Sequence, residues 1–258
     1  AGLTARDLAM NVALPELDGR ILTRAIGFKQ PLTKDPVTHA MTTSYVAADD
    51  RAAFVADLVA RWCRLRHLPN SDKKIGFVLA NYPNKDGRIA NGVGLDTPQS
   101  VLDSLVSLQA AGYDFPDLPD SSADLIAELR KGPTNAGWHG RSCHVHLAKD
   151  IYLQFFKTLP AAMQAAISDR WGEVDDDPMF DGSGFRLPIL LFGNAAIGVQ
   201  PARGYNIDPK ATYHAPDLVP PHNYFGFYLW LRDVWGMDAT VHYGKHGNLE
   251  WLPGKALA

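Results

Sequence analysis

Apolar runs alternate along the chain with amphipathic segments, and this alternation predicts an α/β fold. Near-continuous apolar stretches near residues 75, 190, 197 and 241 are typical of buried strands. Apolar residues at helical spacing appear near residues 58, 104, 160 and 229. The pair Gly193-Asn194 lies between two of the strands and suits a two-residue hairpin turn. We therefore expect a mainly parallel sheet with one β-hairpin and flanking helices.

The first 48 residues do not follow this alternation, because prolines and glycines divide them into short segments. The pattern predicts an irregular N-terminal segment over 1–48 and an α/β domain over 49–258. The helix that opens the domain is expected over 49–67, where apolar residues recur at helical spacing behind two aspartates. The chain stops directly after its richest motif, so we expect it to be an internal piece of a longer protein.

The densest chemistry lies in residues 239–255, at the end of the last predicted strand. His242, His246 and Glu250 are four residues apart, but Gly244 and Gly247 disfavour one continuous helix. A strand, a sharp turn and a short helix fit better, and they place the cluster where α/β sheets bind ligands. Imidazole and carboxylate suit a borderline divalent metal or proton transfer near neutral pH. Histidines in turns also serve as surface or capping residues, so both interpretations stay open.

Two further polar loops follow predicted strands, at 81–96 and 201–214, and we expect them to face the same cleft as the terminal motif. The first loop lacks the third glycine of a dinucleotide fingerprint and the Gly-Lys-Ser/Thr sequence of a phosphate loop. His139, His144 and His146 form a second candidate metal site, although loop histidines are more often solvated.

Composition narrows the class of protein. The 258 residues carry a formal net charge of −3, which argues against nucleic acid as the main partner. The two cysteines, Cys63 and Cys143, do not make a disulfide framework, so a reducing cytoplasm is expected. No apolar run approaches the length of a membrane span.

Three long motifs resemble one family. They are KDGRIANGVGLD at 85–96, QPARGYNIDP at 200–209 and HYGKHGNLEWLPGK at 242–255. Together they are similar to the large subunit of aerobic cobaltochelatase, the CobN type, and the third also resembles the magnesium chelatase large subunit. The resemblance implies an ATP-dependent cobaltochelatase of the cobalamin pathway, a ligase that binds hydrogenobyrinic acid a,c-diamide and inserts Co(II). It also implies an AAA+ ATPase subunit and a companion subunit as partners, with ATP bound on those partners.

The resemblance also assigns catalytic roles within the terminal motif. Glu250 matches the glutamate of the family's His-Gly-x-Leu-Glu pattern and would act as base or hand over the metal. His242 and His246 would be transient metal ligands or proton acceptors, because insertion requires stripping water from the ion and removing pyrrolic protons.

Substrate contacts are implied for five further side chains. Arg203, Lys245 and Lys255 would pair with carboxylates of the tetrapyrrole. Asp208 and His222 are further candidates for the cleft. Two alternatives remain from the residues alone: a non-catalytic scaffold or docking segment of a chelatase for magnesium or another metal, and an independent metallohydrolase, which lacks a third ligand at a known spacing.

Overall fold

The computed structural model describes residues 4–81, 85–92, 94–204, 215, 217–244 and 248–253, except for the side chains of Glu250 and Trp251. The chain forms two compact units, Ala1–His67 and Leu68–Ala258. The boundary follows the helix over 49–67, whereas the sequence pattern placed a boundary before it.

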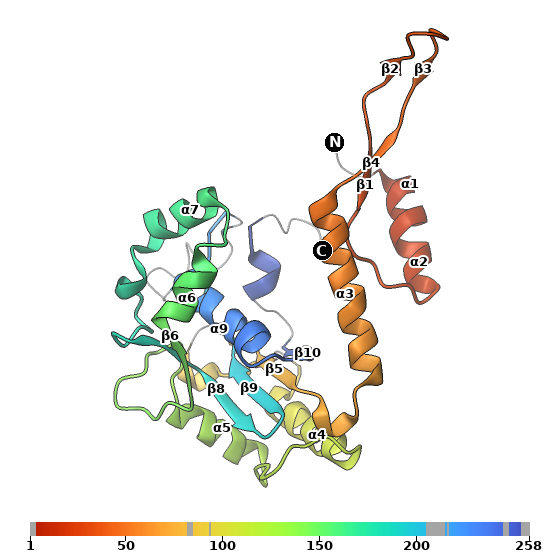
Figure 1. Ribbon diagram of the computed structural model, residues 1–258. Helices are drawn as coiled ribbons and strands as arrows, with labels where there is room; N and C mark the ends of the chain where they lie inside the picture. Colours follow the sequence, from red (N-terminus) through yellow and green to blue (C-terminus); the bar gives the residue numbers. More distant parts are fainter. Residues whose placement is uncertain are drawn as a thin grey trace. The chain divides into compact units, whose positions relative to one another are not determined.

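The first unit combines helices with two short antiparallel ribbons (Figure 1). Its elements are α1 (Ala5–Leu8), a π-helical turn (Ala9–Ala13), α2 (Leu14–Leu17), β1 (Gly27–Lys29) paired with β4 (Tyr45–Ala47), β2 (Thr33–Lys34) paired with β3 (Met41–Thr42), and α3 (Asp49–His67). Helix α3 belongs to this unit because Arg24 lies over the Phe54 ring at 3.7 Å and Arg51 lies over Phe28 at 5.1 Å.

The second unit is built on a mixed four-stranded sheet in the order β10-β5-β9-β8. The strands are β5 (Ile75–Leu79), β8 (Ile189–Phe192), β9 (Ala195–Val199) and β10 (Ala239–Tyr243). Strand β5 runs parallel to both β10 and β9, while β8 and β9 form the expected hairpin around Gly193-Asn194. The α/β class is therefore confirmed. The sheet itself is mixed, and β6 (Val145–Ala148) and β7 (Gly184–Leu187) form a separate antiparallel pair.

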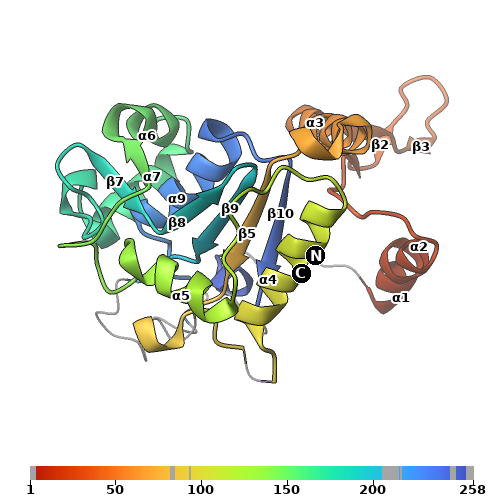
Figure 2. The ribbon, with the colours of Figure 1, turned by 90° about the horizontal axis from the view of Figure 1, so that it is seen from below.

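Helices cover both faces of the sheet (Figure 2). On one face, Phe77 of β5 packs in a core with Leu105 of α4 (Thr97–Ala110) and Leu125 of α5 (Ser122–Lys131). On the other face, Val78 of β5 packs in a core with Phe227 of α9 (His222–Leu229), which continues as a π-helical turn (Trp230–Val234). The described residues of this unit also form α6 (Lys149–Phe156) and α7 (Ala161–Trp171). Short 3-10 turns occupy Asn70–Asp72, Asp86–Arg88, Val174–Asp176 and Asn248–Trp251.

Side chains alternate along each strand, so the neighbouring residues Phe77 and Val78 of β5 lie in the cores on opposite faces of the sheet.

None of the helices in the described residues is long and apolar enough to pass through a membrane.

Candidate functional site

The carboxyl ends of the three parallel strands meet at one edge of the sheet. Leu79, the last residue of β5, is paired with both Tyr243 of β10 and Val199 of β9. The chain leaves β5 toward α4 on one face, and the next described helix after β9 is α9 on the opposite face. Adjacent strands whose connections leave toward opposite faces mark the crevice in which α/β sheets bind ligands. The candidate site therefore lies beyond the ends of β5 and β9.

A buried glutamine connects the elements around this edge. The backbone nitrogen of Gln200 donates to the Leu79 carbonyl at 2.9 Å, and its Nε2 donates to the Tyr228 hydroxyl at 3.1 Å. Its Oε1 accepts a hydrogen bond from the Asn248 backbone nitrogen at 2.9 Å. Asn248 Nδ2 in turn donates to the Pro201 carbonyl at 2.8 Å. Gln200 and Asn248 are 1% and 3% exposed, so these bonds are shielded from water.

This network holds the terminal motif at the strand ends. Asn248 opens the short helix Asn248–Trp251, so the backbone of Glu250 lies at the same edge of the sheet as Gln200. The Glu250 side chain, together with the predicted residues Lys245, His246, Asp208 and Lys255, lies outside the described part of the chain.

His242 is the one predicted catalytic residue whose side chain is described. It lies on β10, one residue before the strand ends, and its imidazole stacks on Tyr228 of α9, with ring centroids 6.0 Å apart and an interplanar angle of 20°. Desolvation lowers the pKa of His242, so the neutral imidazole prevails at neutral pH. Burial also raises the pKa of Tyr228 to about 12, so its hydroxyl stays protonated. A neutral imidazole can bind a metal ion or accept a proton.

Arg203 lies inside the same end of the sheet, three residues after Gln200. Its side chain is 3% exposed, and its guanidinium donates to the Ala215 carbonyl at 2.6 Å. Burial lowers the pKa of Arg203, but an arginine remains charged at neutral pH. The structure thus places a buried cation near the carboxyl end of β9, and its pairing with a substrate carboxylate stays a prediction.

His222 differs from its predicted position in the cleft. It is fully buried at the start of α9, and its Nε2 lies 3.1 Å from the Gly172 carbonyl. Because a carbonyl only accepts, Nε2 carries the proton, and Nδ1 accepts from the Tyr152 hydroxyl at 2.9 Å. Both ring nitrogens are used within the protein, so His222 is a core residue in this arrangement and has no nitrogen left for a ligand.

Asn81 is a residue that the sequence pattern did not single out. It follows Ala80, whose backbone nitrogen donates to the Tyr243 carbonyl at 2.8 Å, so it lies just beyond the carboxyl ends of β5 and β10. Its side chain is 0% exposed, and neither its Nδ2 nor its Oδ1 has a hydrogen-bond partner among the described residues. The sequence could have indicated Asn81, because it is the first polar residue after the continuous apolar run of β5.

The loop after β5 is fixed by a half-buried ion pair. Asp86 Oδ2 accepts from Arg141 at 2.6 Å, and Asp86 Oδ1 accepts from the Thr134 hydroxyl at 2.6 Å. Although burial alone would raise the pKa of Asp86, these hydrogen bonds hold it below its usual value. These bonds hold Asp86 against Thr134 and Arg141, in the segment that follows α5.

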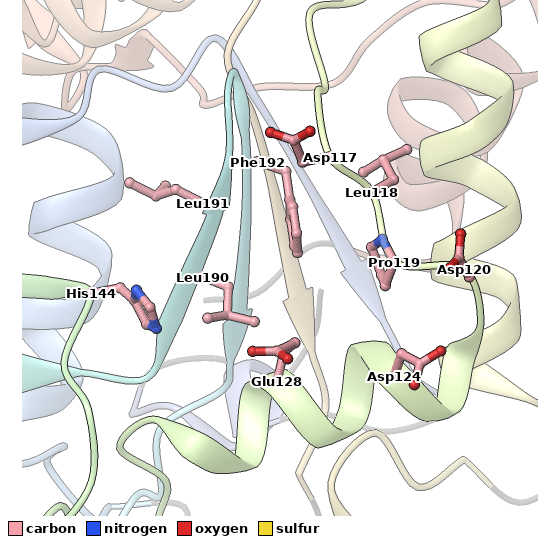
Figure 3. Close-up of a pocket in the computed structure, with 10 residues that line it drawn as sticks. All are labelled: Asp117, Leu118, Pro119, Asp120, Asp124, Glu128, His144, Leu190, Leu191 and Phe192. Carbon is pink, nitrogen blue, oxygen red and sulfur yellow. The ribbon is translucent and has the colours of Figure 1, made fainter.

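The second predicted metal site is not formed. His139 stacks on Trp138 with ring centroids 4.1 Å apart, and His146 lies 3.4 Å from Asp181. His144 lines a separate pocket of about 430 Å³ beside α5 and the edge strand β8 (Figure 3). The three imidazoles therefore have three different environments. Within the part of the chain that is described, no three metal-binding side chains come together.

Comparisons with known proteins identify close relatives over the whole length of the chain. A family model described as CobN/Magnesium Chelatase matches residues 1–258. The aerobic cobaltochelatase subunit CobN of a Sinorhizobium species is 49% identical over 100% of this chain and 20% of the relative. The subunit of the same name from Pseudomonas aeruginosa is 50% identical over 99% of this chain and 21% of the relative.

More distant relatives and a solved structure agree with this grouping. A magnesium-chelatase subunit of Rhodobacter capsulatus is 28% identical over 98% of this chain and 22% of the relative. The catalytic subunit of cobaltochelatase from Mycobacterium tuberculosis has the same fold, with a TM-score of 0.81 and 37% identity over 99% of this chain and 21% of that one. The chain thus spans about a fifth of the length of the cobaltochelatase relatives.

Proposed function

Because this chain belongs to the CobN/magnesium chelatase family, we propose that it is a tetrapyrrole-binding segment of a cobaltochelatase large subunit. That subunit would insert Co(II) into hydrogenobyrinic acid a,c-diamide in cobalamin synthesis. An AAA+ ATPase and its companion subunit would bind ATP and drive the cycle. Identity of 49% and 50% to two cobaltochelatase subunits, against 28% to a magnesium-chelatase subunit, supports cobalt as the inserted metal.

The observation that carries this proposal is the bond between Gln200 and Asn248. It fixes the helix of Glu250 to the end of β9, at the edge of the sheet where His242 also lies. Metal insertion requires groups that bind the ion briefly and accept the pyrrolic protons as the metal-nitrogen bonds form. A neutral imidazole and a carboxylate meet both needs, and we assign these roles to His242 and Glu250, with His246 as a second imidazole.

Substrate binding would rest on cations around the crevice. Arg203 is already desolvated there, so its interaction with a carboxylate would be stronger than in water. We assign Lys245 and Lys255 to the same task, with Asp208 as a polar contact.

The test uses the full-length subunit with its partner subunits, ATP, Co(II) and hydrogenobyrinic acid a,c-diamide. Glu250→Gln keeps the shape of the side chain but removes its charge and basicity. We expect the insertion rate to fall at least about 100-fold while the tetrapyrrole affinity changes little. Glu16→Gln, at an exposed position in the first unit, is the matched control and should keep wild-type rates.

Two outcomes would reject the proposal. Wild-type insertion rates in Glu250→Gln would remove Glu250 from the chemistry. A wild-type subunit that binds neither Co(II) nor the tetrapyrrole would favour a scaffold or docking segment. Parallel assays with Mg²⁺ and Ni²⁺ decide the identity of the metal.

A further inference from the structure

The unpaired amide of Asn81 is unusual because it is fully enclosed. A buried donor or acceptor without a partner loses its bonds to water and gains nothing in return. Asn81 leaves both kinds of atom in this state, Nδ2 as donor and Oδ1 as acceptor, at 0% exposure. Native proteins retain few such groups, and a retained one needs an explanation such as a bound ligand or an internal water.

Two polar neighbours of Asn81 are paired within the protein. The neighbouring Ala80 nitrogen bonds to the Tyr243 carbonyl. Asn135, which reaches the same end of β9, has both amide atoms in use: its Nδ2 donates to the Gln200 carbonyl at 2.9 Å, and its Oδ1 accepts from the Ala202 nitrogen at 2.9 Å. Asn81 differs from the other buried side chains of the described residues because both its donor atom and its acceptor atom lack a partner.

The position of Asn81 points to a ligand. It is the second residue after β5, and Gln200 directly follows β9, so the two residues flank the crevice between these strands. The loop that begins at Asn81 ends at Thr97, the first residue of α4, whose hydroxyl is also fully buried and unpaired. Both ends of this loop thus carry polar atoms that have no partner in the part of the chain that the structure describes.

We propose that Asn81 is a specificity-determining residue that pairs with a side-chain carboxamide of the tetrapyrrole. This inference rests on the proposed function. A primary amide presents a donor and an acceptor in one plane and can satisfy both atoms of the Asn81 amide at once. A carboxylate only accepts, so it would leave Asn81 Oδ1 unpaired. Asn81 therefore favours an amidated substrate over the corresponding acid, and its enclosure means that binding is accompanied by a local rearrangement.

The experiment compares two probes on the full-length subunit, hydrogenobyrinic acid a,c-diamide and hydrogenobyrinic acid, by quenching of protein fluorescence. The wild type should bind the diamide more tightly than the acid. Asn81→Leu, which keeps the shape but removes the polar atoms, should weaken diamide binding about 10-fold or more and acid binding by less, because the acid would pair only with Asn81 Nδ2. The melting temperature of the ligand-free variant should stay equal or rise, because no hydrogen bond is lost.

Asn135→Leu is the matched control for stability. It removes two hydrogen bonds that the protein itself forms, so its melting temperature should fall. If Asn81→Leu does not fold, Asn81→Ala provides the same comparison of the two probes.

The outcomes separate this inference from the proposed function. A wild type without preference for the diamide, or an Asn81→Leu variant that keeps the preference, overturns the role of Asn81 while cobalt insertion still stands. A lower melting temperature with unchanged binding would identify Asn81 as a structural residue that holds an internal water. Loss of all tetrapyrrole binding in the wild type would instead reject the proposed function.

Discussion

Gln200 Oε1 accepts a hydrogen bond of 2.9 Å from the backbone nitrogen of Asn248, 48 residues further along the chain. This bond joins the end of a central strand to the first residue of the helix that carries Glu250. The same side chain also donates to the Tyr228 hydroxyl, and Tyr228 supports the His242 ring. The buried Gln200 side chain thus positions both the backbone of the helix that carries Glu250 and the ring of His242.

Replacing Gln200 by leucine tests this connection. The change leaves the buried Asn248 nitrogen without an acceptor, so we expect the free energy of unfolding to fall by about 1–3 kcal/mol. Because the helix of Glu250 loses its anchor, the insertion rate should also fall. Urea denaturation measures the first effect, and the chelatase assay measures the second.

Gln99→Leu serves as the control for this prediction. Among the described residues, the Gln99 side-chain amide bonds to Asp103 alone, at an exposed place on α4, so its loss should cost less than about 0.5 kcal/mol. Equal costs for the two glutamine variants would show that the Gln200 network does not stabilise this edge.

The sequence was informative where local pattern decides structure. The apolar run over β5, the Gly193-Asn194 turn and the apolar spacing of α3 each determine an element through neighbouring residues, and all three elements are present. The loops after β5 and β9 begin at one edge because parallel strands share their direction, which is also a local rule.

Roles that depend on distant partners could not be predicted in this way. His222 was predicted as a candidate for the cleft, but its environment is set by Tyr152, 70 residues earlier. Asn81 and Gln200 are ordinary polar residues in the sequence, and their importance comes from burial between elements that the chain brings together later. The place of α3 in the first unit likewise depends on its contact with Arg24.

The pH dependence of stability should reveal the desolvation of His242. Its pKa is lowered below the ordinary value of 6.5, so the unfolded chain takes up the proton before the folded protein does. The group has no effect on stability above pH 6.5, and stability falls as the pH drops below 6.5 toward the folded-state pKa. Denaturation between pH about 5 and about 7.5 measures this loss.

His242→Phe is the informative comparison, since it keeps a ring against Tyr228 but cannot be protonated. The variant should lose the part of the pH dependence that lies just below pH 6.5. An identical pH profile in wild type and variant would show that folding does not lower the pKa of His242. Metal insertion by the wild type should fall over the same acidic range, because protonated imidazole neither binds a metal nor accepts a proton.

Gly198 on β9 permits the close approach of α9, and a side chain there should disrupt the site from a distance. A Cβ atom at this position would lie 2.5 Å from Cζ of Phe227, which is fully buried. Gly198→Ala must therefore displace Phe227 and with it the neighbouring Tyr228, which supports His242. We expect a loss of about 1–3 kcal/mol in the free energy of unfolding and a lower insertion rate.

Gly76→Ala on β5 is the matched control, because the nearest atom to its Cβ would be the flexible Met237 sulfur at 3.3 Å. It should cost clearly less than Gly198→Ala. If the clash with Phe227 is the cause, adding Phe227→Leu to Gly198→Ala should cost less than the sum of the two single changes, since the smaller side chain makes room for the new methyl group. Additive costs in this double-mutant cycle would mean that Gly198 acts through the strand backbone and not through the contact with α9.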